Sequence, residues 1–540
     1  MALHFAGSEF DARVAAARAV LRRDNLAAIL LFAQESLYYL TGFDSSGFVF
    51  FQCAVLGAEQ GAITLLTRRP DLEQARRTST ITDIRLWYDA PEADPTAELR
   101  AILEERGLKG ARIGVELRTF GLTADKYALL SARLEGFCEL VDASYLVRGL
   151  RLIKSPSELA YVRRAAELAD RSLQAMLAEA RPGAFEGDIA AAGAVPILSG
   201  GGDPPPSGPV LGSGDRALLV RSASGFRRLD AVDQLTMEFA ASYRHYCACL
   251  MRTVAIGKPN ARQRRMCDVT RAALAAMTDA ARSGRPLGDI DDAHRRVYDA
   301  AGYGTARMSA CGYSLGALFR PTWMDVPPML FAGNRLPAAP GMVLFLHAIL
   351  IDAAENLAMS LGHTIIVGEA EAEVLSRLDT SYIVCAGTTR PMPGRRQRAA
   401  DEGTKGEPRA MAGSAAAYTQ FERERSRPVA GLLARLEFLQ RFRDGVAAAD
   451  PVDADGKCCC RASVLDHHAR LMTAAGKQDG GRRADLRRPK LTPCRACRRG
   501  WRSSPCPPPP LRSAPCTPLR SSAAPRSHSG RSDRRRPRAR

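Results

Sequence analysis

The sequence has no apolar run that approaches the length of a membrane span, and no basic segment followed by an apolar one at its start. A membrane span needs about 20 consecutive apolar residues, and a secretory leader needs both of those parts. Cysteine is sparse in residues 1–384, which hold six of the 14 cysteines, scattered among apolar neighbours. Such cysteines are typical of reduced core thiols. We therefore predict a cytoplasmic protein with no membrane partner.

Residues 1–384 also lack an excess of charge of either sign, since they hold 42 Lys or Arg and 44 Asp or Glu. The net charge of +18 for the whole chain comes from residues 385–540, which hold 34 basic and 14 acidic residues in Arg-, Pro- and Cys-rich runs. Such a composition cannot bury enough apolar area to offset chain entropy. We predict a disordered basic tail over residues 385–540, and no nucleic-acid binding by the folded core.

Motifs for common cofactors are missing as well. The glycine-rich loop at residues 200–209 does not follow a strand and open a helix, as a phosphate-binding loop must. Cys494 and Cys497 form a lone CxxC pair without a second pair at zinc-finger spacing. The motifs therefore give no reason to expect a cofactor.

Short apolar runs alternate with amphipathic segments through the first 150 residues. This alternation predicts an α/β domain over residues 1–150. The strands are expected at residues 26–32, 47–56, 62–67 and 112–116, and the helices at residues 9–24, 95–106 and 123–134.

A strong helix start marks the next domain, residues 151–384. Ser155 is a good N-cap, Pro156 suits the first helical position, and Glu158 completes a capping box, so we predict a helix from there to about residue 180. The later helices are expected at residues 261–284 and 287–301, and the later strands at residues 340–352 and 358–369.

A predicted hairpin at residues 235–254 carries polar groups through an apolar sheet. Its first strand holds Glu238, its tight turn holds His245, and its return strand holds Arg252. Burying such groups is costly unless they are paired or functional. An edge hairpin with a solvated polar face explains the pattern equally well.

This hairpin resembles the first metal-ligand hairpin of the creatinase and aminopeptidase superfamily, which has the pita-bread fold. The resemblance implies a creatinase-like N-terminal domain before an α+β pita-bread domain, and a homodimer. In metallopeptidases of this fold, Asp, Asp, His, Glu and Glu hold two divalent ions. The matching positions here are Glu238, Cys249, Tyr313, His347 and Gly362. One carboxylate cannot neutralise two dications, so we expect no metal and no cofactor.

Longer strings are similar to the ectoine hydrolases, metal-free members of this superfamily. They include Tyr39-Leu-Thr-Gly-Phe-Asp44, Gln234-Leu-Thr-Met-Glu238, Tyr243-Arg-His-Tyr246, Ala310-Cys-Gly-Tyr-Ser-Leu-Gly316 and Trp323-Met-Asp325. The resemblance implies a hydrolase that opens the cyclic amidine ring of ectoine to N-acetyl-diaminobutyrate.

Ectoine carries a carboxylate and a delocalised amidinium, so a site for it needs an anion for the ring and cations for the carboxylate. Glu238 can bind the amidinium or attack its carbon, His363 or His347 can move the proton, and Tyr313 can donate to the tetrahedral centre. The substrate-binding candidates are His245, Arg252, Arg221 and Asp44.

Two other functions stay open for the same residues. One is a metal-dependent Xaa-Pro aminopeptidase or dipeptidase, for which a single zinc on Glu238, Cys249 and His347 is chemically possible. The other is an inactive pita-bread module that binds a ligand without turnover. Ectoine, hydroxyectoine and other cyclic amidines or guanidines also stay open as substrates.

Overall fold

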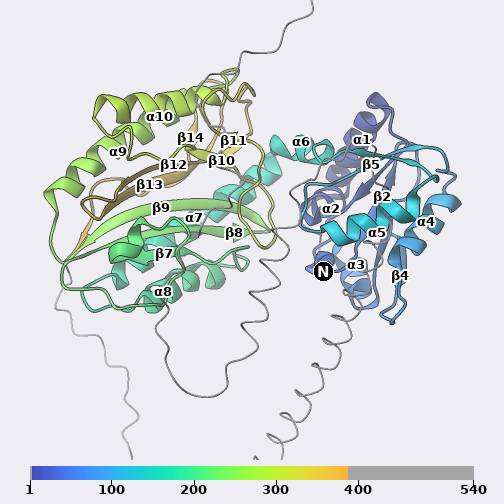
Figure 1. Ribbon diagram of the computed structural model, residues 1–540, viewed down its shortest axis with the longest axis horizontal. Coiled ribbons are helices and arrows are strands. Elements are labelled where there is room, and N and C mark those ends of the chain that lie inside the picture. The colour runs from blue at the N-terminus through green and yellow to red at the C-terminus, as the bar shows by residue number, and fades with distance from the viewer. Residues whose placement is uncertain (1–2, 387–540) are drawn as a thin grey trace, which may run out of the picture. The chain divides into compact units, whose positions relative to one another are not determined.

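The computed structural model describes residues 3–386, which form two domains (Figure 1). Nearly all of the predicted tail, residues 385–540, lies outside the described residues. The two domains belong to one compact unit, so contacts between them are part of the same body.

The N-terminal domain is built on a six-stranded sheet with strand order β4-β3-β2-β1-β5-β6. Strand β1 (Ala28–Leu31) is buried on both faces, because Ile29 and Leu31 pack into one apolar cluster and Leu30 into another. Burial on two faces explains its continuous apolar run, and the predicted α/β domain is confirmed. The other elements are α1 (Gly7–Arg23), α2 (Gln34–Thr41), β2 (Cys53–Gly57), β3 (Thr64–Arg68), α3 (Leu72–Thr78), β4 (Asp83–Trp87), α4 (Pro95–Glu105), β5 (Arg112–Val115), α5 (Ala124–Leu134), β6 (Glu139–Asp142) and α6 (Leu146–Leu152).

The strand predicted at residues 47–56 is wrong in its first half. Residues Gly47–Val49 form a 3₁₀ turn, and pairing begins only at Cys53. Lys126 Nζ donates to the carbonyl oxygens of Val49 and Phe50, at 3.1 and 2.7 Å. These carbonyls are therefore occupied by a charged donor from α5 instead of a neighbouring strand.

The second domain begins with α7 (Pro156–Glu179), and its capping box is confirmed. The Ser155 backbone N–H donates to Glu158 Oε2 at 2.8 Å, and Glu158 N–H donates to Ser155 Oγ at 3.3 Å. Glu158 Oε1 also accepts from the Tyr246 hydroxyl at 2.7 Å. The helix start is thus fixed against the central sheet as well as capped.

The sheet of this domain has nine strands, in the order β11-β10-β12-β13-β9-β8-β7, with β14 on β13 and β15 on β9. The predicted α+β arrangement is confirmed. The elements after α7 are α8 (Glu186–Ser199), β7 (Val210–Ser213), β8 (Asp233–Tyr243), β9 (Tyr246–Ile256), α9 (Ala261–Ala280), α10 (Gly288–Ala300), β10 (Gly312–Ser314), β11 (Met329–Leu330), β12 (Val343–Asp352), β13 (Leu357–Ile366), β14 (Glu373–Val374) and β15 (Val384–Cys385).

The predicted hairpin is the longest antiparallel pair of the sheet. Strands β8 and β9 pair from Asp233 with Ile256 to Tyr243 with Tyr246. The two turn residues, Arg244 and His245, have φ of 52° and 66°. Positive φ at both positions is the signature of a type I′ turn, whose twist matches that of the flanking strands.

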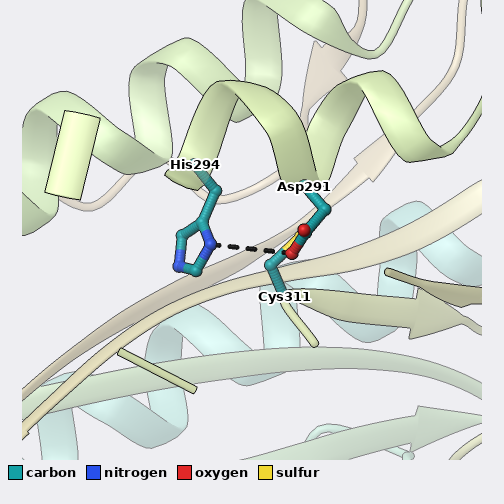
Figure 2. Close-up of side chains that lie close together, drawn as sticks. All are labelled: Asp291, His294 and Cys311. Atoms are coloured by element: carbon teal, nitrogen blue, oxygen red, sulfur yellow. Dashed lines mark ion pairs between the residues drawn. The ribbon is translucent and has the colours of Figure 1, made fainter. Parts of the chain in front are cut away.

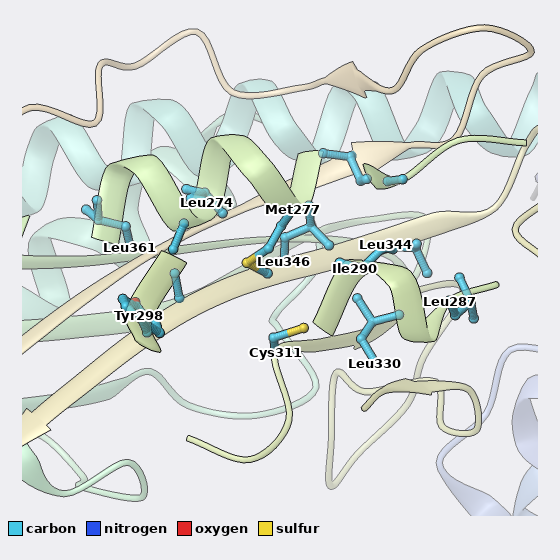
Figure 3. Close-up of a cluster of buried hydrophobic side chains, with 14 of the residues drawn as sticks. Leu274, Met277, Leu287, Ile290, Tyr298, Cys311, Leu330, Leu344, Leu346 and Leu361 are labelled. Carbon is cyan, nitrogen blue, oxygen red and sulfur yellow. The ribbon is translucent and has the colours of Figure 1, made fainter. Parts of the chain in front are cut away.

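The four helices of this domain cover one face of the sheet. Figure 1 shows α9 and α10 beside β12 and β13, and α7 and α8 beside β7 and β8. Alternate residues of the strands, such as Leu346 and Leu361, pack on α9 and α10 in a large apolar cluster (Figure 3). The residues between them, such as Phe345 and Met251, point to the other face, where the candidate site lies.

Candidate active site

Strand register places the five positions of the two-ion site on the helix-free face of the sheet. Glu238 pairs with Met251, Met251 with Gly362, and Gly362 with His347, which makes one row across four strands. In the neighbouring row, Phe345 pairs with both Thr364 and Tyr313. Cys249 belongs to this second row, since its backbone N–H donates to Thr364 Oγ1 at 2.7 Å.

A cavity of about 570 Å³ opens on this face. Three of the four predicted catalytic residues and one predicted substrate-binding residue line it. These are Glu238, Tyr313, His347 and Arg221, which are joined by Ser207, Gly208, Pro209, Val210, Val220, Ser222, Ala223, Met308, Ser309, Ala310, Pro321, Thr322, Trp323, Met324, Met329 and Ile349.

Among residues 3–386, Glu238 is the only carboxylate in the lining. Burial raises its pKa to about 7, although the hydrogen bond from Tyr313 and the charge of Arg221 act in the opposite direction. The Trp323 indole N–H donates to the Tyr313 hydroxyl at 2.8 Å, and that hydroxyl lies 3.2 Å from Glu238 Oε1. Because the hydroxyl oxygen already accepts from Trp323, its own proton is directed at Glu238.

His347 lies at the other end of the same row, three strands away from Glu238. Burial lowers its pKa to about 4, so the imidazole is neutral at pH 7. Its ring centroid lies 5.7 Å from that of Tyr313. Buried Nδ1 has no hydrogen-bond partner among residues 3–386. A neutral imidazole with a free nitrogen can accept a proton and give it back.

Arg221 stands at the rim of the cavity, in the loop between β7 and β8. Its side chain is exposed and makes no hydrogen bond or ion pair with the part of the chain that the structure describes. Its charge lowers the pKa of Glu238, which places it within electrostatic reach of that carboxylate. The guanidinium is free to pair with an anionic substrate group.

Two predicted residues, His363 and Arg252, do not reach this cavity. They point to the helix-covered face, since they alternate with Gly362 and Met251 along their strands. His363 Nε2 lies 3.1 Å from Thr278 Oγ1 of α9. Arg252 Nη1 donates to the backbone oxygens of Met251 and Gly362, both at 2.8 Å. Arg252 is 1% exposed and His363 is 8% exposed, and both face away from the cavity, so neither side chain can touch a ligand there.

His245 and Asp44 form a pair of their own at the hairpin turn. His245 Nε2 lies 3.0 Å from Asp44 Oδ2, and the imidazole stacks on Phe319 at 4.2 Å between ring centroids. The backbone N–H of His245 donates to Asp203 Oδ2 at 2.8 Å. Neither His245 nor Asp44 lines the cavity. The pair joins the N-terminal domain to the hairpin of the second domain.

Trp323 is the residue of this site that sequence reasoning did not assign. The sequence marks it only as part of a Trp-Met-Asp string, and its contact with Tyr313 depends on a loop of irregular backbone. A buried indole needs an acceptor for its N–H. This need is the one feature of the sequence that could have indicated a polar side chain, such as Tyr313, next to Trp323.

The donor set does not fit a two-ion centre. A side chain at Gly362 would place its Cβ 2.8 Å from the Phe345 ring and 2.9 Å from the Leu346 oxygen, so no ligand can stand there. Cys249 is buried in an apolar cluster, and burial raises its thiol pKa well above the usual range. Glu238 remains as the one carboxylate, whereas two bridged dications need several.

The pKa of Glu238 leads to a test of stability. A carboxyl with a raised pKa stays protonated in the folded state after the unfolded chain has ionised, so the fold loses stability as pH rises from about 4.5 to about 7. Glu238→Gln removes this loss. We expect the variant to gain about 1–3 kcal/mol over the wild type at pH 8, and nothing at pH 4.5. Urea unfolding at both pH values measures the difference, and an equal effect at both would contradict the raised pKa.

Comparison with known proteins agrees with this architecture. Residues 160–369 match the model of metallopeptidase family M24, and residues 13–153 match that of the creatinase/prolidase N-terminal domain. A solved Xaa-Pro dipeptidase from Bacillus anthracis superposes with a TM-score of 0.61 at 21% identity, over 69% of this chain and 99% of that chain. A prolidase from Thermococcus sibiricus gives 0.63 at 19% identity, over 69% and 99%. The predicted fold is thereby confirmed.

Among relatives in sequence, the ectoine hydrolase of Halomonas elongata is 26% identical over 402 residues, which cover 70% of this chain and 97% of that protein. An uncharacterized hydrolase/peptidase of Sinorhizobium fredii is 27% identical over 331 residues, or 59% and 84%. The Xaa-Pro dipeptidase of Pyrococcus furiosus is 26% identical over 171 residues, or 32% and 49%. No helix within residues 3–386 is long and apolar enough to cross a bilayer.

Proposed function

We propose that this chain, which joins a creatinase-type N-terminal domain to the pita-bread domain of metallopeptidase family M24, is a hydrolase that opens a cyclic amidine such as ectoine. The observation that carries the proposal is the single carboxylate, Glu238, in a cavity whose other polar groups are Tyr313, His347 and Arg221. The ectoine hydrolase of Halomonas elongata, which matches along 97% of its length, supports this choice of substrate.

Each group has a role in this reaction. Glu238 binds the amidinium through charge-assisted hydrogen bonds, and the amidinium in turn stabilises the ionised carboxylate. Arg221 at the rim pairs with the substrate carboxylate. The Tyr313 hydroxyl, which donates to Glu238 in the free protein, turns its one proton to the tetrahedral centre that forms at the amidine carbon. His363 and Arg252 lie on the other face of the sheet, so the proton is carried by His347 and the substrate carboxylate by Arg221.

The bond changes balance without a further reactant. Water forms a C–O bond at the amidine carbon, and the His347 imidazole takes one of its protons. The proton then passes to the ring nitrogen as the C–N bond breaks. The product is a linear amide with a free amine, which for ectoine is N-acetyl-diaminobutyrate. Direct attack by Glu238 on the same carbon is the covalent variant of this path.

Incubation of the full chain with ectoine, followed by proton NMR, tests the activity. We expect the ring signals to be replaced by those of an N-acetyl group, at a rate that does not change after brief treatment with a chelator or addition of Mn²⁺, Co²⁺ or Zn²⁺. The donor set of the cavity is the reason to expect no metal dependence. The control reaction is hydrolysis of a dipeptide that ends in proline, because the Xaa-Pro dipeptidases among the relatives are named for that substrate.

The outcomes separate three functions. Activity on the proline dipeptide that appears only with added metal would favour a metal-dependent dipeptidase, the function named for the Pyrococcus relative. Binding of ectoine without ring opening would favour a ligand-binding module. The homodimer and the cytoplasmic location remain predictions, which gel filtration with light scattering and cell fractionation can check.

Arg221 supplies a test of how the substrate is bound. We expect Arg221→Ala to raise the KM for ectoine about tenfold and to change kcat by less than about threefold, because an exposed charge-assisted contact contributes to ground state and transition state alike. Arg228→Ala is the matched control, since Arg228 is exposed in the same loop but does not line the cavity. Equal KM values for the two variants would remove Arg221 from the binding site.

A further inference from the structure

Three metal-binding side chains gather behind the sheet, away from the cavity. Asp291 and His294 come from α10, and Cys311 comes from the segment just before β10. One donor atom from each of the three lies within 4.8 Å of the others. His294 Nδ1 and Asp291 Oδ1 are 3.8 Å apart. Figure 2 shows the imidazole, the carboxylate and the thiol turned toward one another.

The environment of this cluster is apolar and closed. All three side chains are buried, with Asp291, His294 and Cys311 each 0% exposed. Cys311 stands among Leu330, Leu346 and other apolar residues of the core (Figure 3). A polar group in such a place requires a partner, because a buried donor or acceptor without one loses its hydration and gains nothing in return.

Apart from the Cys311 thiol, which stands beside Asp291 within the cluster itself, that partner is missing within residues 3–386. Neither carboxylate oxygen of Asp291 and neither ring nitrogen of His294 makes a hydrogen bond there. Arg307 is the nearest cation, but its Nη1 lies 3.9 Å from Asp291 Oδ1 and donates instead to the Met308 carbonyl at 3.0 Å. The four atoms are thus buried and without a hydrogen bond, and of the two imidazole nitrogens Nδ1 is the one that faces Asp291 (Figure 2).

We propose that Asp291, His294 and Cys311 bind one zinc ion. Carboxylate oxygen, imidazole nitrogen and thiolate sulfur are the three protein donors of Zn²⁺, at about 2.0–2.3 Å from the ion. A carboxylate and a thiolate together carry the two negative charges that neutralise a dication. The residues Asp291 and His294 are three apart on a helix and so share one face. A water molecule would complete the tetrahedron.

The local structure already orients the ligands. The His294 imidazole packs edge-on against Tyr298, with 4.7 Å between ring centroids, which holds the ring plane. The Cys311 backbone N–H donates to the Leu330 carbonyl at 3.0 Å, and the Cys311 carbonyl accepts from His347 N–H at 2.9 Å. Only small shifts of three side chains would bring the donors to bonding distance.

An ion here is structural, and it is separate from the proposed hydrolase chemistry. None of its three ligands lines the cavity. It would tie α10 to the backbone that continues from Cys311 to Tyr313, and Cys311 is hydrogen-bonded to His347. The ion therefore holds in place strand β10, which carries Tyr313, and strand β12, which carries His347. It does so without contact with substrate. The proposal does not depend on which substrate the cavity binds.

Metal content of the purified full chain tests the site. The chain is produced with zinc in the medium, desalted, and analysed by elemental mass spectrometry. We expect Cys311→Ser and Asp291→Asn each to contain about one zinc fewer per chain than the wild type. Cys267→Ser is the matched control, because Cys267 is a buried cysteine of the same apolar cluster that is not a ligand. The differences between variants cancel any zinc held by the cysteines after residue 386.

Cobalt gives a second measurement on the same proteins. Loaded with Co²⁺, wild type and Cys267→Ser should share a thiolate-to-cobalt charge-transfer band that Cys311→Ser lacks. Asp291→Asn keeps the shape of the side chain, so it decides the matter if Cys311→Ser does not fold. Equal zinc content in Asp291→Asn, Cys267→Ser and the wild type would overturn the proposal and leave Asp291, His294 and Cys311 as a metal-free polar cluster.

Discussion

Glu238→Gln should fold normally and lose at least about a thousandfold in turnover of ectoine. Glutamine keeps the size of the side chain and can still accept from the Tyr313 hydroxyl, which lies 3.2 Å from Glu238 Oε1. It loses the charge that, in the proposed function, binds the amidinium. One lost charge-assisted contact accounts for about 1.5–3 kcal/mol, or roughly ten- to a hundredfold. The variant also lacks an anion that can act at the reacting carbon, and this second loss lowers turnover further.

The measurement is kcat for ectoine ring opening, with unfolding curves as the check on folding. Glu355→Gln is the matched control, because Glu355 is an exposed carboxylate at the turn between β12 and β13 and should leave kcat unchanged. The kcat of His347→Ala should lie between those of Glu238→Gln and Glu355→Gln. Near wild-type turnover by Glu238→Gln together with an inactive His347→Ala would show that the imidazole is the primary group.

Features with local causes could be predicted from the sequence. The start of α7 depends on a Ser, a Pro and a Glu within four residues, and the capping box formed as expected. The hairpin of β8 and β9 depends on its alternation of apolar residues and on a two-residue turn, and it also formed. In both cases the interactions that decide the structure join residues close in the chain.

The candidate site was predictable only in part, because it depends on which face of the sheet each side chain occupies. His347 and His363 look alike in sequence, as single imidazoles in long apolar strands. Register separates them, since His347 pairs with Gly362 and His363 pairs with Leu346. A register shift of one residue moves every side chain of a strand to the opposite face of the sheet. No local signal in β13 indicates which of its side chains α9 will cover.

Long-range contacts explain two further differences. Strand β2 begins late because Lys126 of α5, more than 70 positions further along the chain, binds the carbonyls of Val49 and Phe50. The helix α8 (Glu186–Ser199), which contains Pro196, was not predicted. Its N-terminal Glu186 is buried and bonded to Ser213 and Arg216, so tertiary contacts hold a helix that its own sequence supports poorly.

Tyr313→Phe should lower turnover about a hundredfold and move the pH dependence of kcat/KM upward. The substitution removes the hydroxyl that donates to Glu238, and with it the acceptor of the Trp323 indole N–H. Removing one donor aimed at developing charge costs about a hundred- to a thousandfold in turnover. The hydrogen bond from Tyr313 lowers the pKa of Glu238, so its loss raises that pKa.

The sign of the pH effect follows from the role of the carboxylate. Glu238 must be ionised to bind the amidinium, so kcat/KM rises as pH increases through its pKa of about 7. A higher pKa moves this rise to higher pH. Trp323→Phe is the matched control, since it keeps the Tyr313 hydroxyl and removes only the indole that orients it. We expect that variant to lose about tenfold or less, with a smaller shift. An unchanged pH profile in Tyr313→Phe would mean that its hydroxyl does not act on Glu238 in the working enzyme.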